Sequence, residues 1–114
     1  MPKRQKKLGG KLKHMTAIHN ANYSIVGYVQ GDKILDTNYS IVGYFRQDAI
    51  LNKNFSIVGY VRGDQILNTS FSIVGYVKNK EFLNSRYSIV GRYDGLNKGL
   101  AGAAAFLLLP FGAW

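Results

Sequence analysis

The chain has 114 residues, a formal net charge of +9, 46 % hydrophobic and 18 % charged residues, and no cysteine. This length predicts one domain with a modest core, and the composition excludes disorder of the whole chain. Without cysteine there is no disulfide framework, thiol nucleophile or cysteine-based zinc site.

The first segment is a basic arm, predicted to span residues 1–16 and to be solvated and flexible. It carries six positive charges and no acidic residue, whereas the rest of the chain has nine basic and six acidic residues. These six are the candidate polyanion-binding residues, Lys3, Arg4, Lys6, Lys7, Lys11 and Lys13. Lysines and histidines interrupt the apolar run that a secretory signal needs, so we expect a cytoplasmic or membrane-associated protein.

Residues 17–94 are predicted to form one domain made of five copies of a sixteen-residue repeat. Each copy contains an aromatic residue followed by Ser-Ile-Val-Gly. A tyrosine follows the glycine in four copies, and Arg92 takes that place in the fifth. The structural repeat glycines are Gly27, Gly43, Gly59, Gly75 and Gly91. A fixed period indicates a repeat architecture.

Each repeat is predicted to be a β-hairpin. The YSIVGYV phrase is rich in β-branched and aromatic residues, a shorter run such as KILDT precedes it, and Asn, Asp and Ser mark the turn between them. Strict alternation places Ile25, Gly27 and Val29 on one face and Val26 and Tyr28 on the other. Both faces are apolar, so five hairpins must pack side by side to bury them. The repeated glycine indicates a close approach of another backbone.

The predicted fold class is all-β, a closed five-fold pseudosymmetric ring of two-stranded hairpins with a short C-terminal apolar helix or segment. An open solenoid is the alternative, with the unusual fifth repeat and the apolar tail as its cap. The apolar character of both strand faces and the count of five favour the ring, because closure removes exposed sheet edges.

The pattern I-x-[DN]-x-N-x-x-I-V-G-x-V, repeated five times and followed by a tail of small residues and leucines, resembles the bacterial proteins called five-fold β-flowers. The resemblance covers about residues 17–110 and implies a ring of hairpin petals, with no established activity. Many copies in that family have glycine where Asn22, Asn38 and Asn54 stand here, and Ser70 and Arg86 are further departures.

Residues 95–114 form the C-terminal apolar segment. A helix is predicted from Leu100 to Leu109, capped by Asn97 and ended by Pro110. The segment is shorter than the roughly twenty apolar residues of a bilayer span. Either it covers an open end of the ring, or it docks to a membrane or protein partner. The candidate docking residues are Phe106, Leu107, Leu108, Leu109, Phe111 and Trp114.

Few residues are suited to catalysis. His14 and His19 are the only acid–base groups that titrate near neutral pH, and their spacing does not place them on one face of a strand. Asp32, Asp48 and Asp64 recur at the repeat period, either as an acidic rim or as turn residues on a solvated edge, and we favour the second interpretation. We expect no enzyme activity, no metal site and no cofactor.

Four tyrosines also recur with the repeat and invite two interpretations. They could stack on nucleic-acid bases, aided by nearby basic residues, or pack between neighbouring repeats. Packing is favoured, because each lies close to an apolar valine on the same strand face. The four are Tyr28, Tyr44, Tyr60 and Tyr76.

The sequence therefore predicts a non-enzymatic structural or binding module that presents loops and an apolar tail to a partner. The alternatives are a nucleic-acid-binding protein that uses the lysine-rich arm, and a membrane-associated protein anchored by the C-terminal segment. The sequence indicates neither the ligand nor the oligomeric state.

Overall fold

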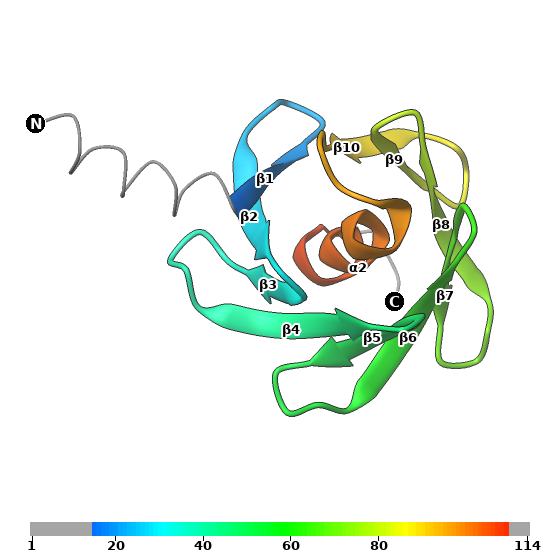
Figure 1. Cartoon of the computed structure of the whole chain (residues 1–114). Helices are drawn as coiled ribbons and strands as arrows, with labels where there is room; N and C mark the ends of the chain where they lie inside the picture. Colours follow the sequence, from blue (N-terminus) through cyan, green and yellow to red (C-terminus); the bar gives the residue numbers. More distant parts are fainter. Residues whose placement is uncertain (1–14, 110–114) are drawn as a thin grey trace, which may run out of the picture.

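The computed structural model describes residues 15–109 as a closed barrel of ten antiparallel strands around one helix (Figure 1). The strands are β1 (Met15–Asn20), β2 (Ile25–Gln30), β3 (Lys33–Leu35), β4 (Ile41–Arg46), β5 (Ala49–Asn52), β6 (Ile57–Arg62), β7 (Gln65–Asn68), β8 (Ile73–Lys78), β9 (Glu81–Asn84) and β10 (Ile89–Arg92). The helix is α2 (Lys98–Leu108).

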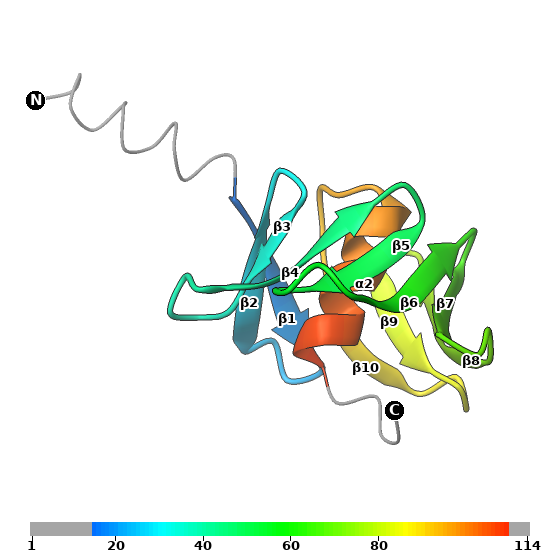
Figure 2. The ribbon, with the colours of Figure 1, turned by 90° about the horizontal axis from the view of Figure 1, so that it is seen from below.

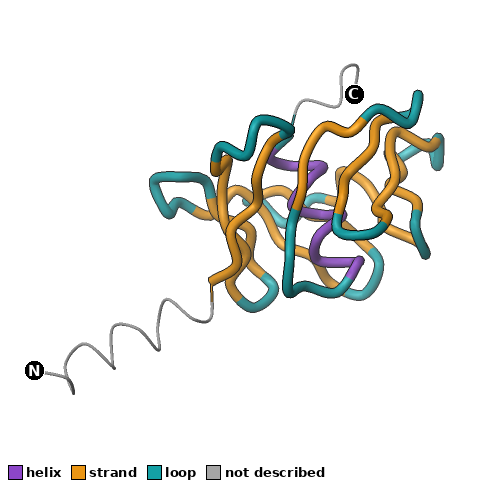
Figure 3. Tube along the Cα trace, turned by 90° about the horizontal axis from the view of Figure 1, so that it is seen from above, coloured by secondary structure: helices purple, strands orange, loops and turns teal. Residues whose placement is uncertain are grey.

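Each strand pairs with its neighbours in sequence, and β1 pairs with β10 to close the ring. The predicted closed ring of five hairpins is thus confirmed, and the open-solenoid alternative is wrong. β1 begins at Met15, two residues before the predicted start of the repeat domain. Short turns connect the strands at both ends of the barrel (Figure 3).

One type of turn joins the two strands of every repeat. A side-chain Oδ1 at the start of the turn accepts the backbone N–H groups two and four residues later, at 2.8–3.0 Å. The accepting residues are Asn20, Asp36, Asn52, Asn68 and Asn84. Three residues after the accepting residue, each repeat has an aromatic residue whose backbone is in the left-handed region. Its φ is 64° to 68° at Tyr23, Tyr39, Phe55, Phe71 and Tyr87.

The strict alternation of strand faces is wrong, because each repeat contains a β-bulge. In the second repeat, Ile34 pairs with Gly43 and the next residue, Leu35, pairs with Ile41, so Val42 is the extra residue. The valines at this position pack against the core in all five repeats. Ile25 was expected to share one face with Gly27 and Val29, but the bulge separates them: Gly27 and Val29 are buried, and Ile25 is 44 % exposed.

Helix α2 lies inside the barrel (Figures 1 and 2). Covering an open end of the ring was one of the two places expected for it, but its buried residues, Ala101 to Phe106, contribute to the barrel core. A layer of five fully buried side chains, one from each repeat, surrounds the helix. These residues are Ile18, Ile34, Ile50, Ile66 and Phe82. Small helix residues are required in this space, since a Cβ on Gly102 would lie 2.9 Å from Val61 Cγ2.

The helix ends are consistent with the sequence. Asn97 is the N-cap, and its Oδ1 accepts the Leu100 N–H at 2.8 Å. Within residues 15–109, no helix is both long and apolar enough to cross a membrane.

The repeat glycines make room for the last turn of the helix. A Cβ on Gly43 would lie 2.3 Å from the Leu51 carbonyl oxygen and 2.5 Å from Leu107 Cδ1. In the same way Gly27 faces Leu108, Gly59 faces Phe106 and Gly91 faces Leu109. Consecutive helix residues, about 100° apart, thus reach successive glycines of the ring. The predicted close approach at the glycines is present as both a neighbouring backbone and a helix side chain.

Candidate functional site: the seam between β1 and β10

The five junctions between neighbouring repeats are built to one pattern, and one of them departs from it. At four junctions a tyrosine pairs across the strands with a leucine, as Tyr28↔Leu35, Tyr44↔Leu51, Tyr60↔Leu67 and Tyr76↔Leu83. At the fifth, between β1 and β10, the corresponding pair is His19↔Arg92. We call this β1–β10 junction the seam.

Aromatic stacking shows the same break in symmetry. The tyrosine of one repeat stacks on the left-handed aromatic residue of the next, with ring centroids 4.5–5.1 Å apart, in the pairs Tyr28–Tyr39, Tyr44–Phe55, Tyr60–Phe71 and Tyr76–Tyr87. At the seam the Arg92 guanidinium lies over the Tyr23 ring instead, 4.8 Å from its centroid. This contact is a cation–π interaction.

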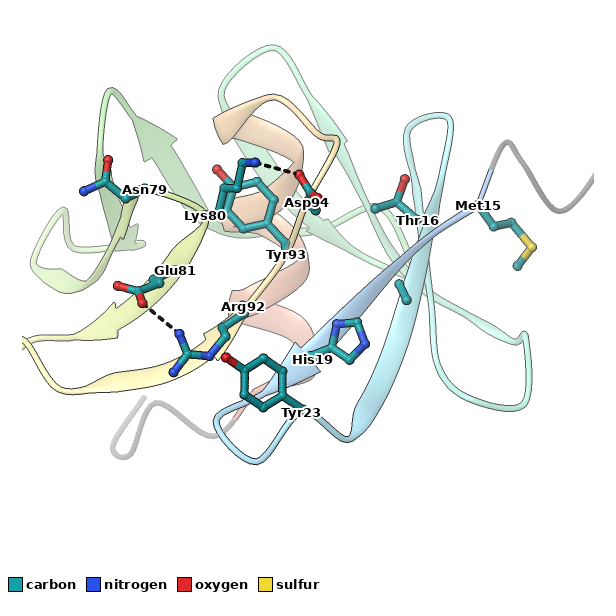
Figure 4. A pocket seen from close by; sticks show the side chains of 11 residues that line it. Met15, Thr16, His19, Tyr23, Asn79, Lys80, Glu81, Arg92, Tyr93 and Asp94 are labelled. Carbon is teal, nitrogen blue, oxygen red and sulfur yellow. Dashed lines mark hydrogen bonds and ion pairs between the residues drawn. The ribbon is translucent and has the colours of Figure 1, made fainter.

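The seam is also the least complete junction of the barrel. β1 and β10 share two residue pairs, His19↔Arg92 and Asn20↔Gly91, whereas the strands at the other four junctions share three or four. Beyond Arg92 the chain leaves the barrel wall toward the helix, and a pocket of about 550 Å³ opens there. Its lining residues are Met15, Thr16, Ala17, His19, Tyr23, Asn79, Lys80, Glu81, Arg92, Tyr93 and Asp94 (Figure 4).

Two ion pairs hold the β9–β10 side of this pocket. Arg92 Nη1 lies 2.7 Å from Glu81 Oε2, and Lys80 Nζ lies 3.1 Å from Asp94 Oδ1 (Figure 4). Arg92 Nε is buried and has no hydrogen-bond partner among residues 15–109. A buried donor without a partner is costly, so Arg92 departs from the usual pairing of buried polar groups.

Tyr93 lies between the two ion pairs in sequence and lines the same pocket. Burial raises the pKa of its phenol above 10.0, although Lys98 and Lys80 act in the opposite direction. The hydroxyl therefore stays protonated at neutral pH and can donate a hydrogen bond. At the closed end of the seam, where β1 and β10 meet, the polar groups are the Arg92 guanidinium, the Glu81 carboxylate paired with it and the His19 imidazole (Figure 4).

The structure does not bring the predicted site residues together. The residues Phe106 to Leu109 lie within the barrel, Phe106 9 % and Leu109 3 % exposed, and Leu107 and Leu108 pack against the core. Phe111 and Trp114, and likewise the basic arm with Lys3, Arg4, Lys6, Lys7, Lys11 and Lys13, lie outside the described residues. The five repeat glycines are structural, spaced around the helix.

The recurring acidic and aromatic residues have structural partners. Asp32 pairs with Arg46 and Asp48 with Arg62, at 3.3 and 3.1 Å. Asp64 pairs with Lys98 of the helix. In the part of the chain that the structure describes, no three His, Asp or Glu residues gather in a way that could hold a metal ion. The four repeat tyrosines pack between repeats, as predicted.

Sequence reasoning missed the seam itself. Arg92 was noted as a departure from the repeat, but His19 was considered only together with His14, as a candidate acid–base group. The missing signal was the register. His19 occupies the place of Leu35 in the first repeat, and the chain ends of a closed ring meet where its first and last repeats lie side by side.

The fold and the seam define a small structural β module: a closed ring of five hairpins, filled by its own helix and broken in symmetry at one junction. The family model of the 5-fold beta-flower proteins matches residues 1–110. The chain belongs to this family. Comparison with curated proteins and with solved structures gave no match.

Proposed function

We propose that this chain is a non-enzymatic binding module that holds its ligand at the seam. The observation that carries the proposal is the replacement of the Tyr–Leu pair by Arg92 and His19 at the junction with the fewest residue pairs, where a pocket opens. Positions that break a rule kept elsewhere in the same fold are expected at functional sites.

Stability alone does not account for the replacement. In the other repeats, Leu35 and Leu67 at the position of His19 are 5 % and 6 % exposed, and they contribute apolar burial. Arg92 and His19 forgo that burial, and Arg92 leaves one buried N–H without a partner. A ligand whose acceptor reached this N–H would compensate for the second loss.

The residues of the pocket are suited to binding more than to catalysis. Its charged groups, Lys80 with Asp94 and Arg92 with Glu81, are already paired with each other, and pairing favours fixed geometry. A covalent mechanism needs a nucleophile held against a base, and the pocket offers donors without that arrangement. The ring around the pocket serves as a rigid frame.

The test compares the wild-type chain with a double variant, His19→Leu with Arg92→Tyr, which restores the pattern of the other four junctions. Restoring the pattern should raise the free energy of unfolding by about 1 kcal/mol, because the variant gains a buried leucine and a stacked aromatic pair. A lower melting temperature for the double variant would show that the polar pair serves the fold, and would count against the proposal.

Binding is measured on the same two proteins. A set of small carboxylates, amines and neutral amides is added to the isotope-labelled chain, and amide chemical shifts are followed. The shifts should concentrate on β1 and β10 and vanish in the double variant. Equal shifts at all five junctions, or shifts that survive in the double variant, would refute a seam site.

A further inference from the structure

We infer that the seam receives the C-terminal end of an extended peptide, which adds to β1 as a strand and places its carboxylate against Arg92 and His19. This inference rests on the proposed function and names the class of ligand. Three features of the seam support it. β1 has an unpaired strand edge, the opening between β1 and the chain that follows β10 has a suitable length, and hydrogen-bond donors lie at the closed end of this opening. We call the opening the wedge.

The unpaired edge is that of β1. In the second repeat, the Asp32 carbonyl, which corresponds to Thr16, accepts the N–H of Phe45 in the following strand at 3.0 Å. Alternate residues of a strand direct their N–H and C=O groups to opposite sides. The backbone groups of Thr16 and Ile18 therefore face β2, whereas those of Met15 and Ala17 face the seam, where the described β10 has no pair for them.

The opposite wall of the wedge has open backbone groups as well. Tyr93 N–H donates to the Lys80 carbonyl of the β8–β9 turn at 3.0 Å, so the groups of Asp94 point the other way, toward β1. β10 ends at Arg92, and Gly95 turns the chain away with φ 75°. Main-chain hydrogen bonds are what strand addition uses for affinity, and both walls can supply them.

The size of the opening fits a short peptide. Four residues of β1, Met15 to Ile18, lie ahead of the pair that closes the seam, which corresponds to about 13 Å of strand. The pocket of about 550 Å³ lies along this stretch. A peptide chain that continued past Ala17 would have to break the His19↔Arg92 pair, so the bound chain must end there.

The closed end supplies the groups that a terminal carboxylate needs. Arg92 uses one N–H on Glu81, its side chain is 28 % exposed, and its Nε has no partner in the described structure. A guanidinium binds a carboxylate through two parallel N–H groups, and His19 lies directly across the strand pair. The peptide therefore runs parallel to β1, with its last residue beside these two side chains.

The ligand is unidentified, so the probe is a library of random seven-residue peptides displayed with free C-termini, selected on the full chain. Selection on the double variant, His19→Leu with Arg92→Tyr, serves as the background. The enriched peptide is then synthesised as the free acid and as the C-terminal amide. The acid should bind at least tenfold more tightly, because the amide cannot form the charged hydrogen bonds.

A matched pair of variants locates the carboxylate. Arg92→Gln should weaken the acid about tenfold and leave the amide unchanged. Arg62→Gln should change neither, although Arg62 also lies over aromatic rings and pairs with an acidic residue, Asp48, at another junction. Hydrogen exchange at the amides of Met15 and Ala17 should slow when the acid is bound, since strand addition protects them.

Three results would overturn the inference: no peptide enriched above the background, equal binding of acid and amide, or an acetate ion that reproduces the whole response without protection of β1. If small carboxylates still shift the seam while no peptide is enriched, the inference fails and the proposed function stands. If neither binds, both fail.

Discussion

The seam and the other four junctions use the same backbone plan with different side chains, and the contrast shows where this fold can vary. At the four regular junctions, a stacked aromatic pair and a tyrosine–leucine pair cover the outside of the wall. At the seam, an arginine over a tyrosine and a histidine take their places. The barrel still closes: β1 and β10 share two residue pairs, and side chains of the helix fill its interior.

A second difference concerns connectivity. Two-residue turns at positions such as Gly31–Asp32 join the strands at the regular junctions, whereas no turn crosses the seam. A junction without a turn is free to open, and the wedge lies there. The proposed site therefore lies at the junction where the described chain has an unpaired strand edge.

The largest expected effect comes from the glycines that all junctions share. Gly43→Ala places a Cβ 2.3 Å from the Leu51 carbonyl oxygen, which is backbone and cannot move aside, so the loss of stability should be about 3 kcal/mol. Gly31→Ala is the control, since nothing lies within 4 Å of its Cβ; its φ of +64° should cost about 1 kcal/mol. Urea denaturation measures both.

Gly91→Ala tests whether the seam accommodates an added Cβ at a lower cost in stability than a regular junction does. A Cβ on Gly91 would lie 2.6 Å from the His19 carbonyl oxygen. Because β1 is held to β10 by only two residue pairs, Gly91→Ala should cost less than Gly43→Ala. An equal or larger loss would mean that the seam is as rigid as the regular junctions.

Much of this architecture could be predicted from the sequence. The sixteen-residue period, the turn residues and the strand glycines predicted five hairpins in a closed ring, and the glycines do mark close approaches. The position of the helix could not be predicted in this way. Alanine-rich composition indicates a helix that packs closely, but it does not distinguish a helix on the end of a ring from one inside it.

The bulge and the seam were missed for a related reason. Both depend on register between strands, and a register shift at Leu35↔Ile41 changes which residues face the core without changing the local pattern. His19 likewise looks ordinary within its own repeat. It is informative only beside Arg92, seventy-three residues away, once the ring is known to close.

The next effect in size concerns the left-handed aromatic residues. Phe55→Ala should cost about 2 kcal/mol, because the stack on Tyr44 is lost while the strained φ of 66° remains. Phe55→Gly should recover about 1 kcal/mol of this loss, since glycine adopts that φ freely. Thermal unfolding followed by circular dichroism separates the two; identical melting temperatures would mean that the backbone carries no strain there.

Tyr23 gives the seam counterpart of that experiment. Its ring contacts the Arg92 guanidinium rather than another ring, and it is more exposed than Phe55. Tyr23→Ala should therefore cost about 1 kcal/mol, less than Phe55→Ala. A loss at the seam as large as that at Phe55 would indicate that the cation–π contact replaces the aromatic stack fully.

The smallest expected effect is electrostatic and concerns the ion pair that joins the helix to a regular junction. Lys98, through a hydrogen bond and its charge, lowers the pKa of Asp64 below 3.8, and Asp64 in turn raises the pKa of Lys98 above 10.5. A lowered carboxyl pKa adds stability above its unfolded value, and that stability is lost as pH falls through the folded value. Asp64→Asn should therefore reduce the fall in the melting temperature of the chain as the pH is lowered through and below the ordinary range of carboxyl pKa values.

A matched substitution at the seam sharpens this comparison. Asp94 pairs with Lys80; in the regular pair Asp32–Arg46 the acidic and basic residues occupy the opposite positions of the repeat. The Asp94 side chain is 81 % exposed, compared with 42 % for Asp64. Solvent screens exposed ion pairs strongly, so Asp94→Asn should change the melting temperature at acidic pH less than Asp64→Asn does. In high salt both variants should approach the wild-type profile. A larger change from Asp94→Asn would mean that the seam, rather than the helix contact, is the electrostatically sensitive part of the ring.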